Sequence, residues 1–156
     1  MSSPAQASEA TPATPVPREE LLAALNELLE AERAGARVAM ETGCEISVAD
    51  LAALVADIHK DEVHWCGMLM RQIKALEGEA SSTTGAFWGK AMAIPDVGDR
   101  LLFLNRGQAW VVRKLQALIP RVQDSSLRTD LSAMLEAHHT NIERVEARNR
   151  AGGAAA

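Results

Sequence analysis

The sequence predicts an all-α protein, a four-helix bundle of two antiparallel helical hairpins joined by a long crossover that contains a short helix. Three observations predict this fold. Good helix formers, above all Ala and Leu, dominate a chain of 156 residues that has no Tyr and only 3% aromatic residues. Apolar residues recur at helical spacing in four long segments. Two of the three connections between these segments are short, and the middle one is long.

The first two predicted helices form the first hairpin. Residues 17–42 make the first helix, because Pro17 suits a first helical position and Gly43 suits a left-handed end. The second helix starts after Ser47, which we expect to cap it, and ends at Gly78. Because the connection between them is short, the two helices are expected to run antiparallel.

The last two predicted helices form the second hairpin. The third helix starts after Asp96 and stops before Pro120, whose ring does not fit inside a helix. The fourth helix covers residues 124–148. Residues 79–96 join the hairpins, and at about 3.3 Å per residue they can cross the full length of the bundle. We expect residues 85–94 within this crossover to form the short helix.

Composition and charge limit the possible functions. A net charge of -5 and a pI near 5.4 argue against a nucleic-acid binder that works through a basic face. The sequence has no phosphate-binding loop, so we expect no nucleotide cofactor. It also has no apolar segment long enough to span a membrane and no secretory signal, and a cytoplasmic location is expected.

The chain is predicted to hold one domain. We expect a disordered tail over residues 1–16, the helical bundle over residues 17–149, and a flexible tail over residues 150–156. Cys44 follows the first helix and Cys66 lies well inside the second. This separation is too great for a disulfide, so both thiols are expected to be free.

One polar residue interrupts the apolar stripe of each long helix near its midpoint. These residues are Glu32, Glu62, Gln108 and His138. In a bundle of equal helices the four midpoints lie at one level, so the four side chains are expected to meet in the core. Two buried carboxylates are costly unless they are protonated, paired or bound to a cation. The inward stripes carry no Lys or Arg near this level, which leaves a shared proton, trapped water, a metal ion, or a hydrogen-bonded network that fixes helix register.

Four segments carry a resemblance to a known superfamily: residues 25–36 (LNELLEAERAGA), 61–69 (DEVHWCGML), 104–113 (LNRGQAWVVR) and 134–142. Over residues 18–147 the chain resembles the ferritin-like superfamily, and particularly a bacterial ferritin-like family of unknown function.

The resemblance implies a metal site. Di-iron members take one Glu from each of two helices and Glu-x-x-His from each of the other two. Glu32, Glu62 and His138 match three of those positions, whereas Gln108, Trp65 and Leu135 stand where the pattern has Glu, His and Glu. The implied site is therefore a single Fe, Mn or Zn ion held by Glu32, Glu62 and His138, with Gln108 as a ligand or beside the ligands.

Polar and apolar residues also lie on the outward faces. Asp61 with His64, and Glu136 with His139, repeat the acid-x-x-His spacing but lie off the apolar stripes, so we expect them at the surface. Two outward apolar ridges need cover. Phe103 and Trp110 form one, and Val63, Gly67 and Met70 form the other; Phe87 and Trp88 of the crossover, or a second copy in a homodimer, are the expected covers. Trp65 is expected to face inward, with its indole N–H near the polar ring.

Three functions follow as hypotheses from these observations. The first is a metal-binding bundle with redox or oxygen-related chemistry. The second is a metal-free dimeric scaffold or interaction protein whose buried polar network is structural. The third is a protein that binds a small molecule at the buried polar ring.

Overall fold

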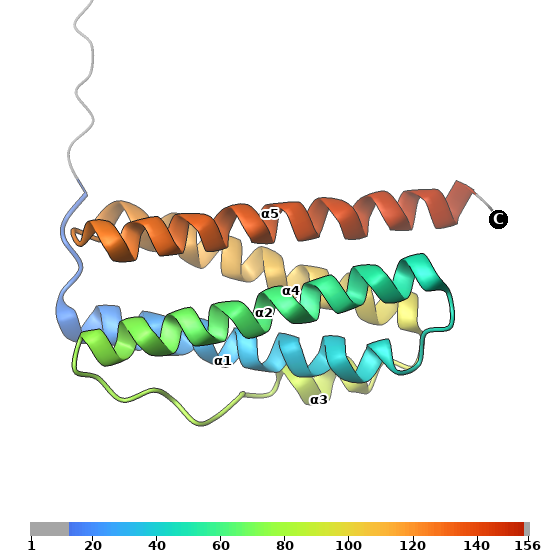
Figure 1. Ribbon diagram of the computed structural model, residues 1–156, viewed down its shortest axis with the longest axis horizontal. Helices are drawn as coiled ribbons and strands as arrows, with labels where there is room; N and C mark the ends of the chain where they lie inside the picture. Colours follow the sequence, from blue (N-terminus) through green and yellow to red (C-terminus); the bar gives the residue numbers. More distant parts are fainter. Residues whose placement is uncertain (1–12, 155–156) are drawn as a thin grey trace, which may run out of the picture.

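The computed structural model describes residues 13–154, and this part of the chain is all-helical (Figure 1). Its elements in chain order are α1 (Arg18–Gly43), α2 (Ala49–Ala75), α3 (Phe87–Met92), α4 (Val97–Leu118), the 3₁₀ turn η1 (Ile119–Arg121) and α5 (Ser125–Ala154). The four long helices and the short helix in the crossover confirm the predicted number and order of elements.

The long helices pack in pairs that are close in sequence. α1 lies along α2, and α4 lies along α5, each pair joined by a short connection (Figure 1). α1 also contacts α4, and α2 contacts α5, so each long helix packs on two others. No helix within the described residues is both long and apolar enough to cross a membrane.

The start of α4 has a side-chain cap, whereas the start of α2 does not. The Asp96 side chain accepts a hydrogen bond from the backbone N–H of Asp99 over 2.9 Å, which satisfies a free N–H of the first turn. The cap position of α2 is Val48, and no side chain caps this helix. The predicted capping role of Ser47 is therefore wrong, because the helix begins one residue later.

The left-handed residue lies at the end of α2 and not at the end of α1. Gly43 remains helical and Cys44 follows it at φ −67°, so the predicted left-handed end at Gly43 is wrong. After α2, Glu77 takes φ 56°. The N–H of Gly78 then bonds the Ile73 carbonyl over 3.0 Å, which completes a Schellman end.

The last helix extends into the expected C-terminal tail. α5 continues to Ala154, so most of the stretch 150–156 is helical; residues 155–156 lie outside the described residues. Residues 1–12 of the expected N-terminal tail also lie outside them. Residues 13–16 run against η1, where Arg121 Nε donates to the Thr14 carbonyl over 3.1 Å and the Val16 N–H donates to the Arg121 carbonyl over 3.0 Å.

The crossover is tied along the outer side of α1 (Figure 1). Asn26 Nδ2 donates to the Glu79 carbonyl over 3.0 Å, and Arg33 Nη1 donates to the Thr83 carbonyl over 2.9 Å. These bonds bring α3 against α1 and α4. A Cβ built at Gly107 of α4 would lie 2.7 Å from the Phe87 ring, so the glycine permits this close approach.

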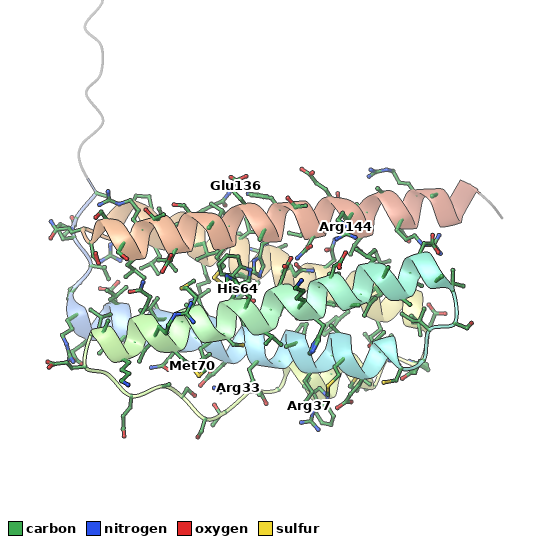
Figure 2. The ribbon with its side chains drawn as sticks, in the orientation of Figure 1. Arg33, Arg37, His64, Met70, Glu136 and Arg144 are labelled. Atoms are coloured by element: carbon green, nitrogen blue, oxygen red, sulfur yellow. The ribbon has the colours of Figure 1, made fainter. Side chains whose placement is uncertain are left out.

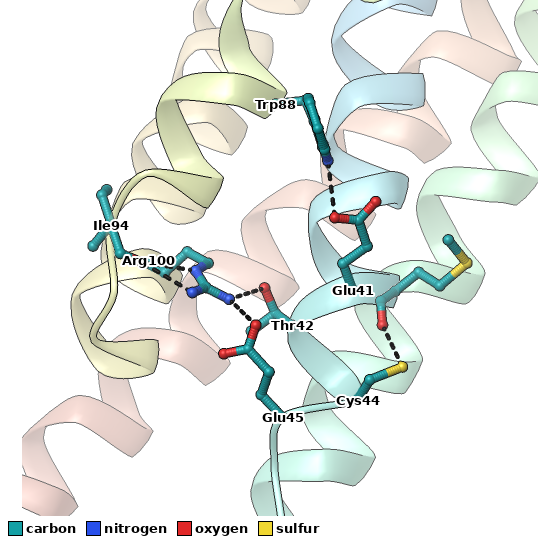
Figure 3. Close-up of polar contacts among 8 residues, drawn as sticks. Glu41, Thr42, Cys44, Glu45, Trp88, Ile94 and Arg100 are labelled. Atoms are coloured by element: carbon teal, nitrogen blue, oxygen red, sulfur yellow. Dashed lines mark hydrogen bonds and ion pairs between the residues drawn. The ribbon is translucent and has the colours of Figure 1, made fainter.

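The far end of the crossover is held by a buried arginine (Figure 3). Arg100 is 3% exposed, and its Nε and Nη2 donate to the Ile94 carbonyl over 3.0 and 2.9 Å. Its Nη1 donates to Glu45 over 2.9 Å and to Thr42 over 3.3 Å. One side chain thus joins the crossover to the α1–α2 connection. The prediction that no inward cation lies at mid-bundle level is unaffected, because these partners are at the end of α1.

The apolar core consists of two clusters. One gathers Leu25, Leu69, Leu115 and Leu131 with their neighbours, and the other gathers Val38, Ile58, Leu104 and Val145 with theirs. Along every long helix, buried polar residues lie at the boundary between the clusters. That boundary is the candidate functional site.

Candidate ligand-binding site

The four predicted polar residues are buried at the boundary between the two core clusters. Their exposed fractions are 1% for Glu32, 3% for Glu62, 2% for Gln108 and 1% for His138. Each comes from a different long helix. The predicted helical phase is therefore confirmed for all four residues.

Glu32 and His138 form a direct pair across the core. His138 Nε2 lies 2.9 Å from Glu32 Oε1, and His138 Nδ1 lies 2.9 Å from the Met134 carbonyl oxygen. A carbonyl oxygen only accepts, so Nδ1 carries a proton. Burial lowers the pKa of the imidazole, but the charge of Glu32 and its hydrogen bond outweigh burial and raise this pKa above its usual range. The contact with Glu32 therefore favours the charged form of His138.

Glu62 reaches the core over a glycine of α1. A Cβ built at Gly35 would lie 2.6 Å from Glu62 Oε1 and 2.8 Å from Oε2, so the carboxyl group occupies the space that any other residue would fill. Burial, the charge of Glu32 and the charge of Asp61 raise the pKa of Glu62 well above its usual range. Glu62 therefore keeps its proton at pH values where exposed glutamates have lost theirs.

Several polar atoms at this level have no hydrogen-bond partner within the described part of the chain. Both amide atoms of Gln108 are in this state, as are Glu32 Oε2 and Glu62 Oε2. The indole N–H of Trp65 also lacks a partner, so the expected bond from Trp65 to the polar ring is wrong. Buried polar atoms in folded proteins are nearly always bonded to protein or to ordered water, so this group is prepared for a further partner.

A cavity of about 580 Å³ opens between α1 and α4 and reaches all four residues. Its walls include Ala31 and Gly35 of α1, Phe87 of α3, and Leu104 and Val111 of α4. Exposed Arg106 and Arg113 lie at its rim. Cavities of this size hold drug-sized or cofactor-sized molecules. We name this space, with Glu32, Glu62, Gln108 and His138 at its inner end, the central pocket.

The rim of the central pocket is aromatic and of mixed charge. Phe87 stacks on Phe103 with ring centroids 5.0 Å apart, so the crossover helix covers part of the predicted outward ridge of α4. Trp110, the other member of that ridge, stays 36% exposed beside the opening. Glu27 is paired with Lys114 over 2.5 Å, and Glu30 accepts hydrogen bonds from Ser81 and Thr83 of the crossover.

The central pocket does not match the ligand set of a di-iron site. Trp65 and Leu135 occupy positions where the ferritin-like pattern has His and Glu, and Gln108 replaces a third ligand. Within residues 13–154, no three His, Cys, Asp or Glu side chains lie close enough together to hold a metal ion. The chemistry of the donor set thus departs from the di-iron pattern at three positions.

The second acid-x-x-His pattern is only partly at the surface, because Asp61 is half-buried. His64 and Glu136 are exposed, and Glu136 projects from α5 away from the other long helices (Figure 2). His139 is half-buried. The predicted free state of both cysteines is also confirmed: Cys44 is exposed and Cys66 is half-buried, where burial raises the pKa of its thiol to about 12.

The outward ridge of α2 remains uncovered. Val63 is 51% exposed and Met70 is 42% exposed on this helix, and Gly67 lies between them. Figure 2 shows Met70 on the near side of the molecule. The homodimer and the scaffold role expected from this ridge stay predictions.

Sequence reasoning missed two buried amides next to the polar ring. Asn141 is 2% exposed and donates to Asp61 over 3.1 Å, and Asn105 is 8% exposed. Asn141 lies one turn after His138, and Asn105 lies one turn before Gln108. Helical spacing from the predicted site was therefore the signal that could have found them.

Comparison with known proteins places the chain in a family. A family model described as "Domain of unknown function (DUF6306)" matches residues 19–147, most of the chain. The chain belongs to this family. The match runs from the first turn of α1 into α5 and includes every residue of the inner end of the central pocket. No curated protein and no solved structure matches the chain significantly.

Proposed function

We propose that this member of the family is a ferritin-like four-helix bundle that binds a small organic molecule in the central pocket. Glu32, Glu62, Gln108 and His138 form the end that recognises the ligand. The observation that carries this proposal is the coincidence of a 580 Å³ cavity with four buried polar atoms that lack partners. A bound molecule that pairs with these atoms exchanges their contacts with water for direct hydrogen bonds, each with a net value of about 0.5–1.5 kcal/mol.

The fold supports the proposal because it keeps α1 and α4 apart at the level of the polar residues. The crossover and α3 lie over the outer side of this opening, where Thr84, Gly85 and Ala86 join the lining. Two hairpins joined by one long crossover are the connectivity of ferritin-like bundles, in which ligand and cofactor sites are built between facing helices. The central pocket occupies that location.

Binding can be tested with a pair of matched variants. Ala31 lines the pocket and Ala23 is exposed on the same helix, so Ala31→Phe fills the cavity while Ala23→Phe adds the same ring to the surface. A fragment library is screened by ligand-observed NMR against the native chain and both variants. We expect fragments that bind the native chain and Ala23→Phe but not Ala31→Phe. Equal fragment binding to all three proteins, or to none, contradicts the proposal.

A single metal ion is the second candidate, and the orientation of His138 favours it. Its Nδ1–H is held by the Met134 carbonyl, which turns Nε2 toward the carboxylates, as in many metal-ligating histidines. The donors would be His138, Glu32 and Glu62, and the Glu62 carboxyl would have to turn toward the pair. An Fe, Mn or Zn ion there would supply redox or Lewis-acid chemistry.

Elemental analysis of protein purified without a chelating tag tests the second candidate. Stoichiometric metal that is lost in both Glu62→Ala and His138→Ala supports it. Metal that survives both substitutions, or native protein free of metal whose melting temperature is unchanged by added Fe, Mn or Zn, argues against it.

A further inference from the structure

In the central pocket, more acceptor atoms than donor atoms lack a hydrogen-bond partner within residues 13–154. Among the buried lining atoms without a partner, Glu32 Oε2, Glu62 Oε2 and Gln108 Oε1 are acceptors, and Gln108 Nε2 is a donor. Exchanging the two amide atoms of Gln108 does not change this count. When both carboxyl groups are ionised, a ligand must therefore bring more N–H or O–H groups than acceptor atoms to its inner end.

The charges at the inner end are unequal as well. Two carboxyl groups, Glu32 and Glu62, face one imidazole, His138. The neighbouring side chains add no buried cation. Asn141 and Asn105, one turn away, are neutral, and Asp61, beside Glu62, is acidic. His59, one turn before Glu62, is half-buried, and its Nδ1 lies 3.0 Å from the Ala36 carbonyl oxygen. Arg100 is the only buried Lys or Arg in residues 13–154, and it is held at the end of α1 by Glu45, Thr42 and the Ile94 carbonyl. With both glutamates ionised, the site has one uncompensated negative charge.

From this count of acceptors and charges we infer that the ligand is an organic monocation with several N–H groups at one end, such as a primary ammonium or an amidinium, and a flat apolar body. The inference rests on the proposed function of the central pocket. The cationic end would lie between Glu62, the free oxygen of Glu32 and the Gln108 amide oxygen. The apolar body would lie along Ala31 and Val111 toward the Phe87–Phe103 stack.

Three probes that share one body and differ in charge test the inference. They are naphthalen-1-ylmethylammonium, the neutral alcohol naphthalen-1-ylmethanol, and the anion 1-naphthoate. Titration calorimetry of the native chain at pH 7 gives the affinity for each probe. We expect the ammonium to bind about tenfold or more tightly than the alcohol, since hydrogen bonds to charged groups are the stronger class.

Glu62→Gln is the decisive variant, and Glu136→Gln on the exposed side of α5 is its matched control. In Glu62→Gln we expect the preference for the ammonium to fall to about threefold or less. A circular dichroism melt shows that each variant is folded. Unchanged preference in Glu62→Gln, or tighter binding of the alcohol or of naphthoate, overturns the inference; the last outcome would mean that rim residues Arg106 and Arg113 decide selectivity.

The failure of this inference is distinguishable from the failure of the proposed function. If library fragments bind in the pocket and are blocked by Ala31→Phe, but the ammonium shows no advantage or does not bind, then the pocket stands and the cation assignment is wrong. If no fragment is blocked by Ala31→Phe, both are wrong.

Discussion

The carboxyl group of Glu62 rests on the backbone of Gly35, where a Cβ would come within 2.6 Å of Glu62 Oε1. This contact joins the midpoints of α1 and α2, and it places the carboxyl at the inner end of the central pocket beside the Glu32–His138 pair. An acidic group can occupy this level of the core because the facing helix has no side chain there.

Gly35→Ala tests that contact. Gly→Ala inside a helix ordinarily gains about 1 kcal/mol. We expect no more than this gain in Gly43→Ala, at the last residue of α1, where the nearest atom is 3.7 Å from the built Cβ. In Gly35→Ala the new methyl displaces the Glu62 carboxyl, so the variant should be about 1–3 kcal/mol less stable than Gly43→Ala in urea unfolding. Adding Glu62→Ala should relieve the clash, giving a coupling of about 0.5 kcal/mol or more. Strict additivity of the two substitutions would show that the contact has no energetic consequence.

Glu62 should make the protein less stable as pH rises. Its pKa in the folded state lies above the value in the unfolded chain, so between these two values the folded state binds more protons and the free energy of unfolding falls with increasing pH. Glu62→Gln removes this dependence. We expect the variant to match the native chain near pH 4 and to exceed its stability at pH 7 and above. The measurement is a series of urea unfolding curves from pH 4 to 8, and a stability difference that does not change with pH would refute the assignment.

The Glu32–His138 pair should be costly to break. His138→Ala leaves the Glu32 carboxylate buried without its cation, a change that costs about 3–5 kcal/mol at pH 6. His139→Ala, the neighbouring and half-buried histidine, should change stability by about 0.5 kcal/mol or less. Because the pKa of folded His138 is raised, its contribution is fully present below the unfolded pKa near 6.5 and is lost as pH rises through the folded pKa. Unfolding at pH 6 and pH 9 checks both statements, and similar losses in the two variants would contradict them.

The fork of Arg100 should be specific to arginine. Arg100→Lys keeps the charge but cannot bond the Ile94 carbonyl and Glu45 together, so we expect a loss of about 1.5–3 kcal/mol. Hydrogen exchange of residues 87–92 should rise in the same variant because the crossover loses its anchor. Arg106→Lys, at an exposed position of the same helix, is the control. If exchange in residues 87–92 is the same in both variants, the clamp does not hold the crossover.

The helical phase of the polar residues was predictable from the sequence because burial follows a 3.6-residue period. Glu32 and His138 come from helices far apart in the chain, yet each interrupts an apolar stripe, and both are buried at the same level. The start of α4 after Asp96 and its end before Pro120 were predictable for a different reason, because local residue types mark helix ends.

The pocket was not predictable in this way, because it depends on the distance between helices. No periodicity reveals that α1 and α4 separate near Ala31 and Val111, or that Gly107 admits the Phe87 ring. The burial of Arg100 was not predicted, because a charged residue on a helix is usually solvated. Whether Arg100 is buried depends on the path of the crossover. Gly78 also serves packing, since a Cβ there would lie 2.5 Å from Leu22.

The side-chain amide of Gln108 provides the most direct test that the buried polar residues form a ligand site. Its N–H₂ group gives a separate pair of signals in a ¹H–¹⁵N correlation spectrum, and both amide atoms lack partners in residues 13–154. During titration with naphthalen-1-ylmethylammonium, we predict that these signals shift in the native chain and in Ala23→Phe but not in Ala31→Phe. Signals that stay fixed while residues on the exposed ridge of α2 shift would contradict the account.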